Sequence, residues 1–111
     1  MYLQKFEVNN KTALVTGAGK GIGKASAIAL AEAGADLIIL SRTVDDLNKV
    51  KKKIIELKRK CTVFKCDISN YEEVKSVFKK ISKLDILVNN AGTNRPDHFT
   101  KITKEDMDYV V

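Results

Sequence analysis

The hydrophobic pattern of the chain alternates between short apolar runs and longer segments in which apolar residues recur at helical spacing. The short runs predict β-strands, and the run from Asp36 to Ser41 is almost wholly apolar, as in a strand covered on both faces. The longer segments predict amphipathic helices. Strands are expected at Thr12 to Thr16, Asp36 to Ser41, Thr62 to Cys66 and Ile86 to Asn89, and helices at Gly21 to about Ala33, Thr43 to about Arg59, Ser69 to about Ile81 and from Thr103 onward.

Local signals mark several ends of these predicted helices. Thr43 with Asp46, and Ser69 with Glu72, have the three-residue spacing of a capping box. Gly34 is a suitable stop for the first helix. The third predicted strand follows the second helix without a glycine turn, so the sequence marks the end of that helix less sharply.

The order of the elements predicts the fold class. Strands that alternate with helices form βαβ units and a parallel sheet. Right-handed crossovers then place the strands, numbered along the chain, in the order 3-2-1-4. We therefore expect an α/β fold that is the N-terminal portion of a doubly wound parallel sheet of the Rossmann type, with the chain ending inside its fourth helix.

The formal net charge of the 111 residues is +6. A solvated helix face explains this excess better than a nucleic-acid interface, because apolar residues alternate with the lysines and no aromatic residues interleave to stack on bases. Nucleic-acid binding is the alternative, and strongly salt-dependent affinity for DNA would indicate it. The basic residues concerned are Lys49, Lys51, Lys52, Lys53, Lys58, Arg59 and Lys60.

Composition also bears on location and on metal sites. No apolar run approaches the roughly 20 residues that span a bilayer, and no secretory signal is evident, so a cytoplasmic protein without a membrane partner is expected. Cys61 and Cys66 flank or occupy one short predicted strand, where a mutual disulfide is awkward. Without a nearby histidine they are predicted to be reduced packing residues and not metal ligands. The single histidine, His98, is predicted to be a loop residue.

The most informative motif follows the first predicted strand. There the chain enters the glycine-rich turn Gly17-Ala18-Gly19-Lys20-Gly21-Ile22-Gly23, and a helix-forming stretch comes directly after it. Such a turn lets backbone N–H groups approach phosphate oxygens, and a helix N-terminus favours negative charge. The motif therefore predicts a site for a nucleotide pyrophosphate. Its spacing departs from the usual dinucleotide fingerprint, because the sixth position counted from Gly17 is Ile22.

Four motifs in the same order resemble the short-chain dehydrogenase/reductase family. They are Thr16-Gly17 with Gly21 and Gly23, then Asp67-Ile68, then Asn89-Asn90-Ala91-Gly92, and finally Thr103 to Asp108 at the start of the last predicted helix. The resemblance covers nearly the whole chain. It implies that residues 1–111 form a dinucleotide-binding Rossmann domain that is incomplete, because the C-terminal catalytic half is absent.

The resemblance also implies roles for individual residues. The glycine turn follows the pyrophosphate and the nearest ribose, Asp67 accepts from the adenine amino group, and Ile68 lies against the adenine ring. The asparagine motif lies at the switch point beside the first strand, where ligands of such sheets bind. The expected cofactor-binding residues are Gly17, Gly19, Lys20, Gly21, Ile22, Gly23, Ser41, Arg42, Asp67, Ile68, Asn89, Asn90, Ala91 and Gly92.

Charge at the end of the second predicted strand indicates which cofactor is preferred. An NAD-binding site places a carboxylate there for the ribose 2′-hydroxyl, whereas this chain has Ser41 and Arg42. Arg42 can pair bidentately with a 2′-phosphate, and Lys20 adds a second cation. Asp45 and Asp46 are expected to lie too far along the next segment to replace the missing acid. NADP(H) is therefore the predicted cofactor, with NAD(H) also possible.

The family's catalytic residues are a Ser and a Tyr-x-x-x-Lys set. We expect them beyond Val111, so no catalytic residue is assigned here and the 111-residue chain alone is expected to be inactive. A full-length parent would interconvert a small-molecule carbonyl and an alcohol by hydride transfer, and would be the form able to make a homo-oligomer. Within the family, the sequence most resembles the 3-oxoacyl-carrier-protein reductase and sugar-acid dehydrogenase branches. The alternative is a nucleotide-binding module or truncated remnant without catalysis.

Overall fold

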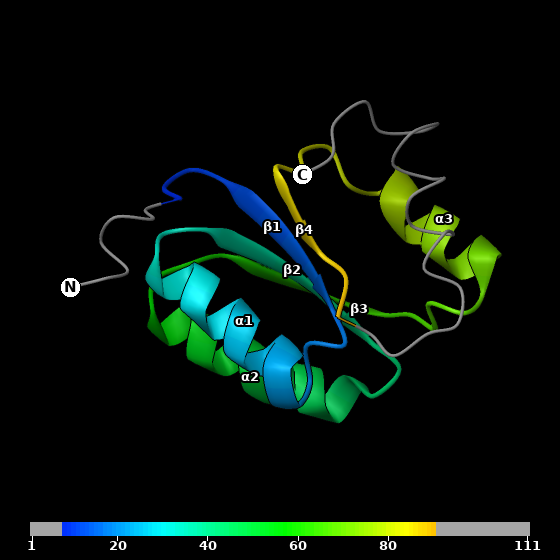
Figure 1. Ribbon diagram of the computed structural model, residues 1–111, viewed down its shortest axis with the longest axis horizontal. Helices are drawn as coiled ribbons and strands as arrows, with labels where there is room; N and C mark the ends of the chain where they lie inside the picture. The colour runs from blue at the N-terminus through cyan, green and yellow to red at the C-terminus, as the bar shows by residue number, and fades with distance from the viewer. Residues whose placement is uncertain (1–7, 91–111) are drawn as a thin grey trace.

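The computed structural model describes residues 8–90, which form a four-stranded parallel sheet with helices on both faces (Figure 1). The strands lie in the order β3-β2-β1-β4, which confirms the predicted order. The predicted fourth helix lies outside the described residues. The elements are β1 (Thr12–Thr16), α1 (Gly21–Glu32), β2 (Asp36–Ser41), α2 (Val44–Glu56), β3 (Cys61–Lys65), α3 (Tyr71–Lys79) and β4 (Ile86–Val88).

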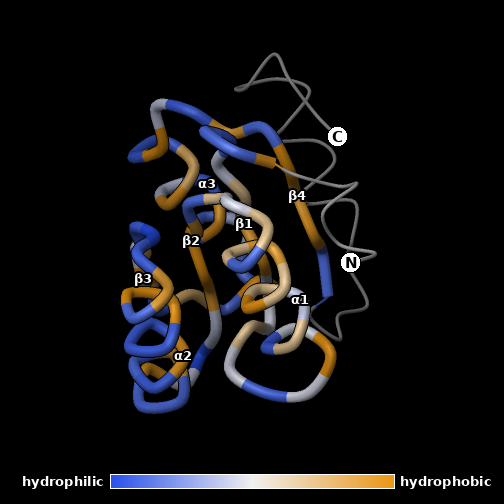
Figure 2. Tube along the Cα trace, turned by 90° about the vertical axis from the view of Figure 1, so that its left-hand side faces the viewer, coloured by the Kyte–Doolittle hydropathy of each residue, from blue (hydrophilic) through white to orange (hydrophobic). Residues whose placement is uncertain are grey.

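The apolar strands are explained by a sheet that is covered on both sides. Helices α1 and α2 cover one face and α3 covers the other (Figure 1). Val15 of β1 packs with side chains of α1 and α2, whereas its neighbour Leu14 packs with those of α3. Ile39 and Ile38 of β2 divide in the same way, since successive side chains of a strand point to opposite faces. Figure 2 shows β2 as hydrophobic over nearly its whole length.

Helix α2 ends earlier than the sequence predicts. It stops at Glu56 with Leu57 as its C-cap, and Lys58 then takes a left-handed conformation with φ of 67°. This position usually carries glycine, so the missing glycine concealed the end of the helix. The chain then joins β3 through Arg59, whose guanidinium donates to the carbonyl oxygen of Gly34 at 3.1 Å.

Helix α3 begins after Asn70, not at Ser69 as the capping-box spacing predicts. The Asn70 side chain accepts from the amide N–H groups of Glu72 and Glu73 at 3.0 and 3.2 Å. The Ser69 hydroxyl instead donates to the Asp67 carboxylate at 2.7 Å. Two adjacent polar residues were both able to cap, and the turn closed by Asp67 places Asn70 at the helix start.

We expect the variant Asn70→Ala to lower the free energy of unfolding by about 1 kcal/mol, because two amides of the first turn of α3 lose their acceptor. Ser69→Ala is the matched control and should change it by less than about 0.5 kcal/mol, since Ser69 is exposed and outside the helix. Urea unfolding of both variants measures the difference. An equal or larger loss from Ser69→Ala would show that Ser69 is the cap after all.

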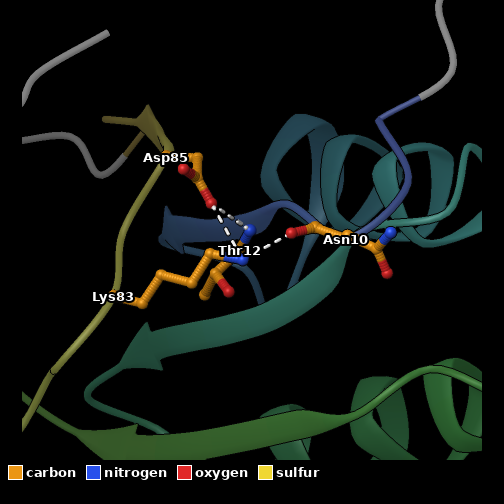
Figure 3. A network of polar contacts seen from close by, with 4 residues as sticks. All are labelled: Asn10, Thr12, Lys83 and Asp85. Atoms are coloured by element: carbon orange, nitrogen blue, oxygen red, sulfur yellow. Dashed lines mark hydrogen bonds and ion pairs between the residues drawn. The ribbon is translucent and has the colours of Figure 1, made fainter.

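Polar contacts fasten β4 to β1 at the amino ends of the strands (Figure 3). The Thr12 amide donates to the Asp85 carboxylate at 2.9 Å, and the Asp85 amide donates to the Thr12 carbonyl at 2.9 Å. Lys83 lies 3.7 Å from the same carboxylate and donates to the Asn10 carbonyl. These contacts hold β4, which has only three residues, in register with β1.

Among residues 8–90, no helix is long and apolar enough to cross a membrane.

Candidate nucleotide-binding site

The glycine-rich turn lies at the carboxyl end of β1, between the ends of β2 and β4. Gly17 opens it in the left-handed region with φ of 61°, and Gly21 has φ of 55°. The Ala18 amide donates to the Leu40 carbonyl at 3.3 Å, which fixes the turn against the end of β2. This is the switch point at which ligands of doubly wound sheets bind.

Glycine at position 23 is required by close packing. A Cβ atom there would lie 2.1 Å from the Gly17 carbonyl oxygen and 2.7 Å from Nδ2 of Asn90. A Cβ at Gly21, in contrast, would meet nothing within 4 Å. The turn is therefore closely packed at Gly23, whereas the space beside Gly21 is open. A pyrophosphate needs such open space in order to approach the backbone.

The amino end of α1 is suited to an anion. Lys20 is its N-cap residue, no side chain caps the helix, and its first turn carries no acidic residue. The first turns of α2 and α3 carry two acidic residues each, which complement the positive end of the helix dipole. The first turn of α1 has no such acidic residue, and Ile22 in this turn is 75% exposed. Both features agree with the predicted path of the cofactor past this turn.

Thr16 links the glycine turn to the asparagine motif. Its side chain is completely buried, and its hydroxyl donates to Oδ1 of Asn89 at 3.1 Å. The Thr16 hydroxyl oxygen in turn accepts from the backbone N–H of Asn90 at 2.8 Å. Asn89 and Asn90 therefore tie the ends of β1 and β4 together, and their partner is Thr16, which the sequence analysis did not name for this contact. Ala91 and Gly92, also predicted in this motif, lie outside the described residues.

The cationic part of the predicted site lies at the end of β2. Ser41 Oγ accepts from the Thr43 amide at 3.1 Å, and Arg42 is exposed. The Lys20 side chain is 82% exposed, and its ammonium group lies 3.8 Å from the carboxylate of Asp46. The structure thus places Lys20 and Ser41 at the same end of the sheet, and the carboxylate of Asp46 lies there as well.

The expectation that Asp46 lies too far away is wrong. A Cβ atom at Gly19 would lie 2.9 Å from the Cβ of Asp46 and 3.8 Å from Ser41 Oγ, so Asp46 packs directly on the glycine turn. Helix α2 lies beside α1 on one face of the sheet, and side chains of a helix point back toward its N-terminus. Asp46 is distant from Gly19 along the chain but close to it in space, because α2 packs beside α1.

Asp67 and Ile68 follow β3 and differ in their surroundings. Asp67 accepts from the amide and the hydroxyl of Ser69, and these bonds hold the pKa of its carboxyl below the usual value, with the positive charge of Arg42 adding to the effect. Ile68 is 8% exposed and packs in the core with Val74 of α3. Most of its side chain is therefore used in packing, which leaves a small apolar surface for the predicted contact with adenine.

The two cysteines lie in β3 and directly after it. Cys66 is buried in the core and Cys61 is half-buried, both as free thiols, and burial raises the pKa of each to about 11. Within the same part of the chain, no group of three or more His, Cys, Asp or Glu side chains could hold a metal ion.

One Tyr-x-x-x-Lys spacing does occur in the chain, at Tyr71 and Lys75 of α3, and sequence analysis overlooked it. Tyr71 packs on the apolar cluster between α3 and the sheet. Helix α3 follows β3, which two strands separate from β4 at the switch point. Tyr71 therefore takes part in the core packing of α3, and no catalytic role is assigned to the pair.

Residues 11–111 match the family model described as short chain dehydrogenase. The chain belongs to the short-chain dehydrogenase family. The fold, the glycine turn and the asparagine motif derived above are thus those of a family member. The match also includes the segment after residue 90, where the predicted fourth helix lies.

Relatives of this family member are longer enzymes. The chain is 44% identical over 96 residues to the 2-dehydro-3-deoxy-D-gluconate 5-dehydrogenase of Pseudoalteromonas atlantica, covering 82% of this chain and 38% of the relative. A solved short-chain type dehydrogenase/reductase from Mycobacterium marinum is 35% identical with a TM-score of 0.76, over 84% of this chain and 40% of that one. A metagenomic short-chain oxidoreductase solved with NADP is 32% identical with a TM-score of 0.72, over 78% and 41%. The chain therefore spans about two fifths of the length of these relatives.

Proposed function

We propose that this chain supplies the cofactor-binding half of a short-chain oxidoreductase that prefers NADP(H) and interconverts a small-molecule carbonyl and an alcohol. The observation that carries the proposal is the glycine turn between β1 and α1, which is closely packed at Gly23 and open at Gly21. The helix that follows this turn has no acidic residue in its first turn. The bound cofactor would supply the hydride, and the residues of this chain would bind and orient the cofactor. The proposed contacts are those of the 14 predicted residues.

The preference for NADP(H) rests on charge. Arg42 follows Ser41 directly in the chain, and Lys20 follows Gly19, where a Cβ atom would lie 3.8 Å from Ser41 Oγ. A 2′-phosphate gains charge-assisted hydrogen bonds from two such cations that a 2′-hydroxyl does not. Solved family members carry either cofactor, since one is in complex with NADP, another with NAD+ and a third with NADH. Family membership alone therefore leaves the choice open, and the local charges favour NADP(H).

Titration of the purified protein with NADPH and with NADH, followed by nicotinamide fluorescence, tests the proposal. We expect NADPH to bind about tenfold tighter or more, because charge-assisted hydrogen bonds contribute roughly 1.5–3 kcal/mol. Equal or tighter binding of NADH would contradict the cofactor preference. Failure to bind either nucleotide would contradict the proposed function itself.

A non-catalytic nucleotide-binding module is the second candidate, because no catalytic residue is assigned among residues 8–90. The two candidates differ in the turnover of a full-length parent that contains residues 1–111, because the chain alone is expected to be inactive in both cases. A parent that binds NADPH and oxidises it in the presence of sugar or oxoacyl carbonyl compounds is an oxidoreductase, whereas a parent that binds NADPH and turns over no carbonyl favours the module.

A further inference from the structure

A carboxylate lies inside the group of side chains proposed to receive the 2′-phosphate. Asp46 Oδ2 lies 3.8 Å from the Lys20 ammonium, and the Asp46 side chain is 24% exposed against 82% for Lys20. Asp46 also packs on Gly19, next to Ser41 Oγ. Asp46 therefore contacts the glycine turn from α2, while Lys20 belongs to that turn and is the N-cap residue of α1.

We propose that Asp46 is an intramolecular counter-ion for Lys20 and that it sets how strongly the site discriminates a 2′-phosphate from a 2′-hydroxyl. The inference rests on the proposed function and assigns a specificity-determining role to a residue of α2. When a 2′-phosphate enters, it competes with Asp46 for Lys20. When a 2′-hydroxyl enters, the Lys20–Asp46 pair stays intact.

The geometry suits an exchangeable pair. The 3.8 Å separation is longer than a charge-assisted hydrogen bond, and the Lys20 end is exposed, so the pair is weak and its cation is available. A phosphate carries more negative charge than a carboxylate and displaces it. The displaced carboxylate remains close because Asp46 is held by α2 against Gly19, and it weakens the binding of the phosphate.

The structure also offers a control for the ordinary role of acids at a helix start. Asp45 and Asp46 both lie in the first turn of α2 and both complement its dipole. Asp45 is exposed, whereas Asp46 contacts the turn. Loss of either charge has the same effect on the helix, but only loss of Asp46 releases Lys20.

The test compares Asp46→Asn with Asp45→Asn in the purified protein, with adenosine 2′,5′-bisphosphate and adenosine 5′-monophosphate as calorimetric probes. We expect Asp46→Asn to raise the ratio of the two affinities, in favour of the bisphosphate, by about three- to fivefold. Asp45→Asn should change the ratio by less than about 1.5-fold. A second variant, Asp46→Ser, removes the same charge with a smaller side chain and should agree with Asp46→Asn.

The Lys20→Gln background identifies the route of the effect. There Asp46→Asn should change the ratio clearly less than it does when Lys20 is present, because only the direct repulsion between the Asp46 carboxylate and the phosphate remains. A full effect in that background, or an equal effect of Asp45→Asn, would overturn the counter-ion role. If both probes still bind and the ratio is unchanged in Asp46→Asn, the inference alone is overturned. If the unsubstituted protein binds neither probe, the proposed function is overturned together with the inference.

Discussion

Gly23→Ala is expected to lower the free energy of unfolding by roughly 3 kcal/mol and to abolish measurable nucleotide binding. The new methyl group would lie 2.1 Å from the Gly17 carbonyl oxygen and 2.8 Å from the Gly17 carbonyl carbon. Both are backbone atoms, so the turn itself must move, and α1 must separate from β1. Because the same backbone is proposed to bind the pyrophosphate, stability and binding should fall together.

Gly21→Ala is the matched control, two residues away. Its φ of 55° makes any side chain there strained, at a cost of about 1–2 kcal/mol, but the methyl group would meet no atom within 4 Å. Urea unfolding and NADPH titration of both variants measure the contrast. A Gly23→Ala protein as stable as Gly21→Ala would contradict the close approach of α1 to the turn.

Arg42→Asp is expected to weaken NADPH binding on the order of 100-fold and to leave NADH binding unchanged or tighter. The substitution removes charge-assisted hydrogen bonds of roughly 1.5–3 kcal/mol and places a carboxylate where a 2′-phosphate would lie. The same carboxylate can accept from a 2′-hydroxyl. Titration with both nucleotides gives the two affinities directly.

Two further variants separate the local effect from net charge. Arg42→Lys keeps the charge and removes the bidentate geometry, so it should lose an intermediate factor of about ten. Lys52→Asp makes the same change of net charge at an exposed position of α2 and should have little effect on either nucleotide. If NADPH affinity in Arg42→Asp did not fall relative to that of NADH, the assigned cofactor preference would be wrong.

The sheet and its order could be predicted because their causes are local or topological. Each position of β2 between its ends is apolar and buried, and such a run has few alternatives to a doubly covered strand. The order then follows from right-handed crossovers. Gly17 and Gly23 were recognisable from spacing, since the turn and the close packing leave few other residues acceptable at either position.

The missed features depend on competition or on tertiary packing. Ser69 and Asn70 are both good N-caps, and the choice is made by the turn that Asp67 closes. Lys58 occupies a left-handed position without the usual glycine, so the end of α2 carried no signal. Asp46 meets Lys20 because α1 and α2 share a face of the sheet. In each case the deciding neighbour is not visible from the local pattern.

The polar contacts between β1 and β4 in Figure 3 lie at the amino ends of the strands, and the glycine turn and its charged neighbours lie at the carboxyl ends. The Thr12 and Asp85 backbone and side-chain groups hold the sheet without any of the atoms that would touch a nucleotide. The proposed cofactor preference therefore depends on side chains such as the exposed Arg42, which take no part in the contacts that join β1 to β4.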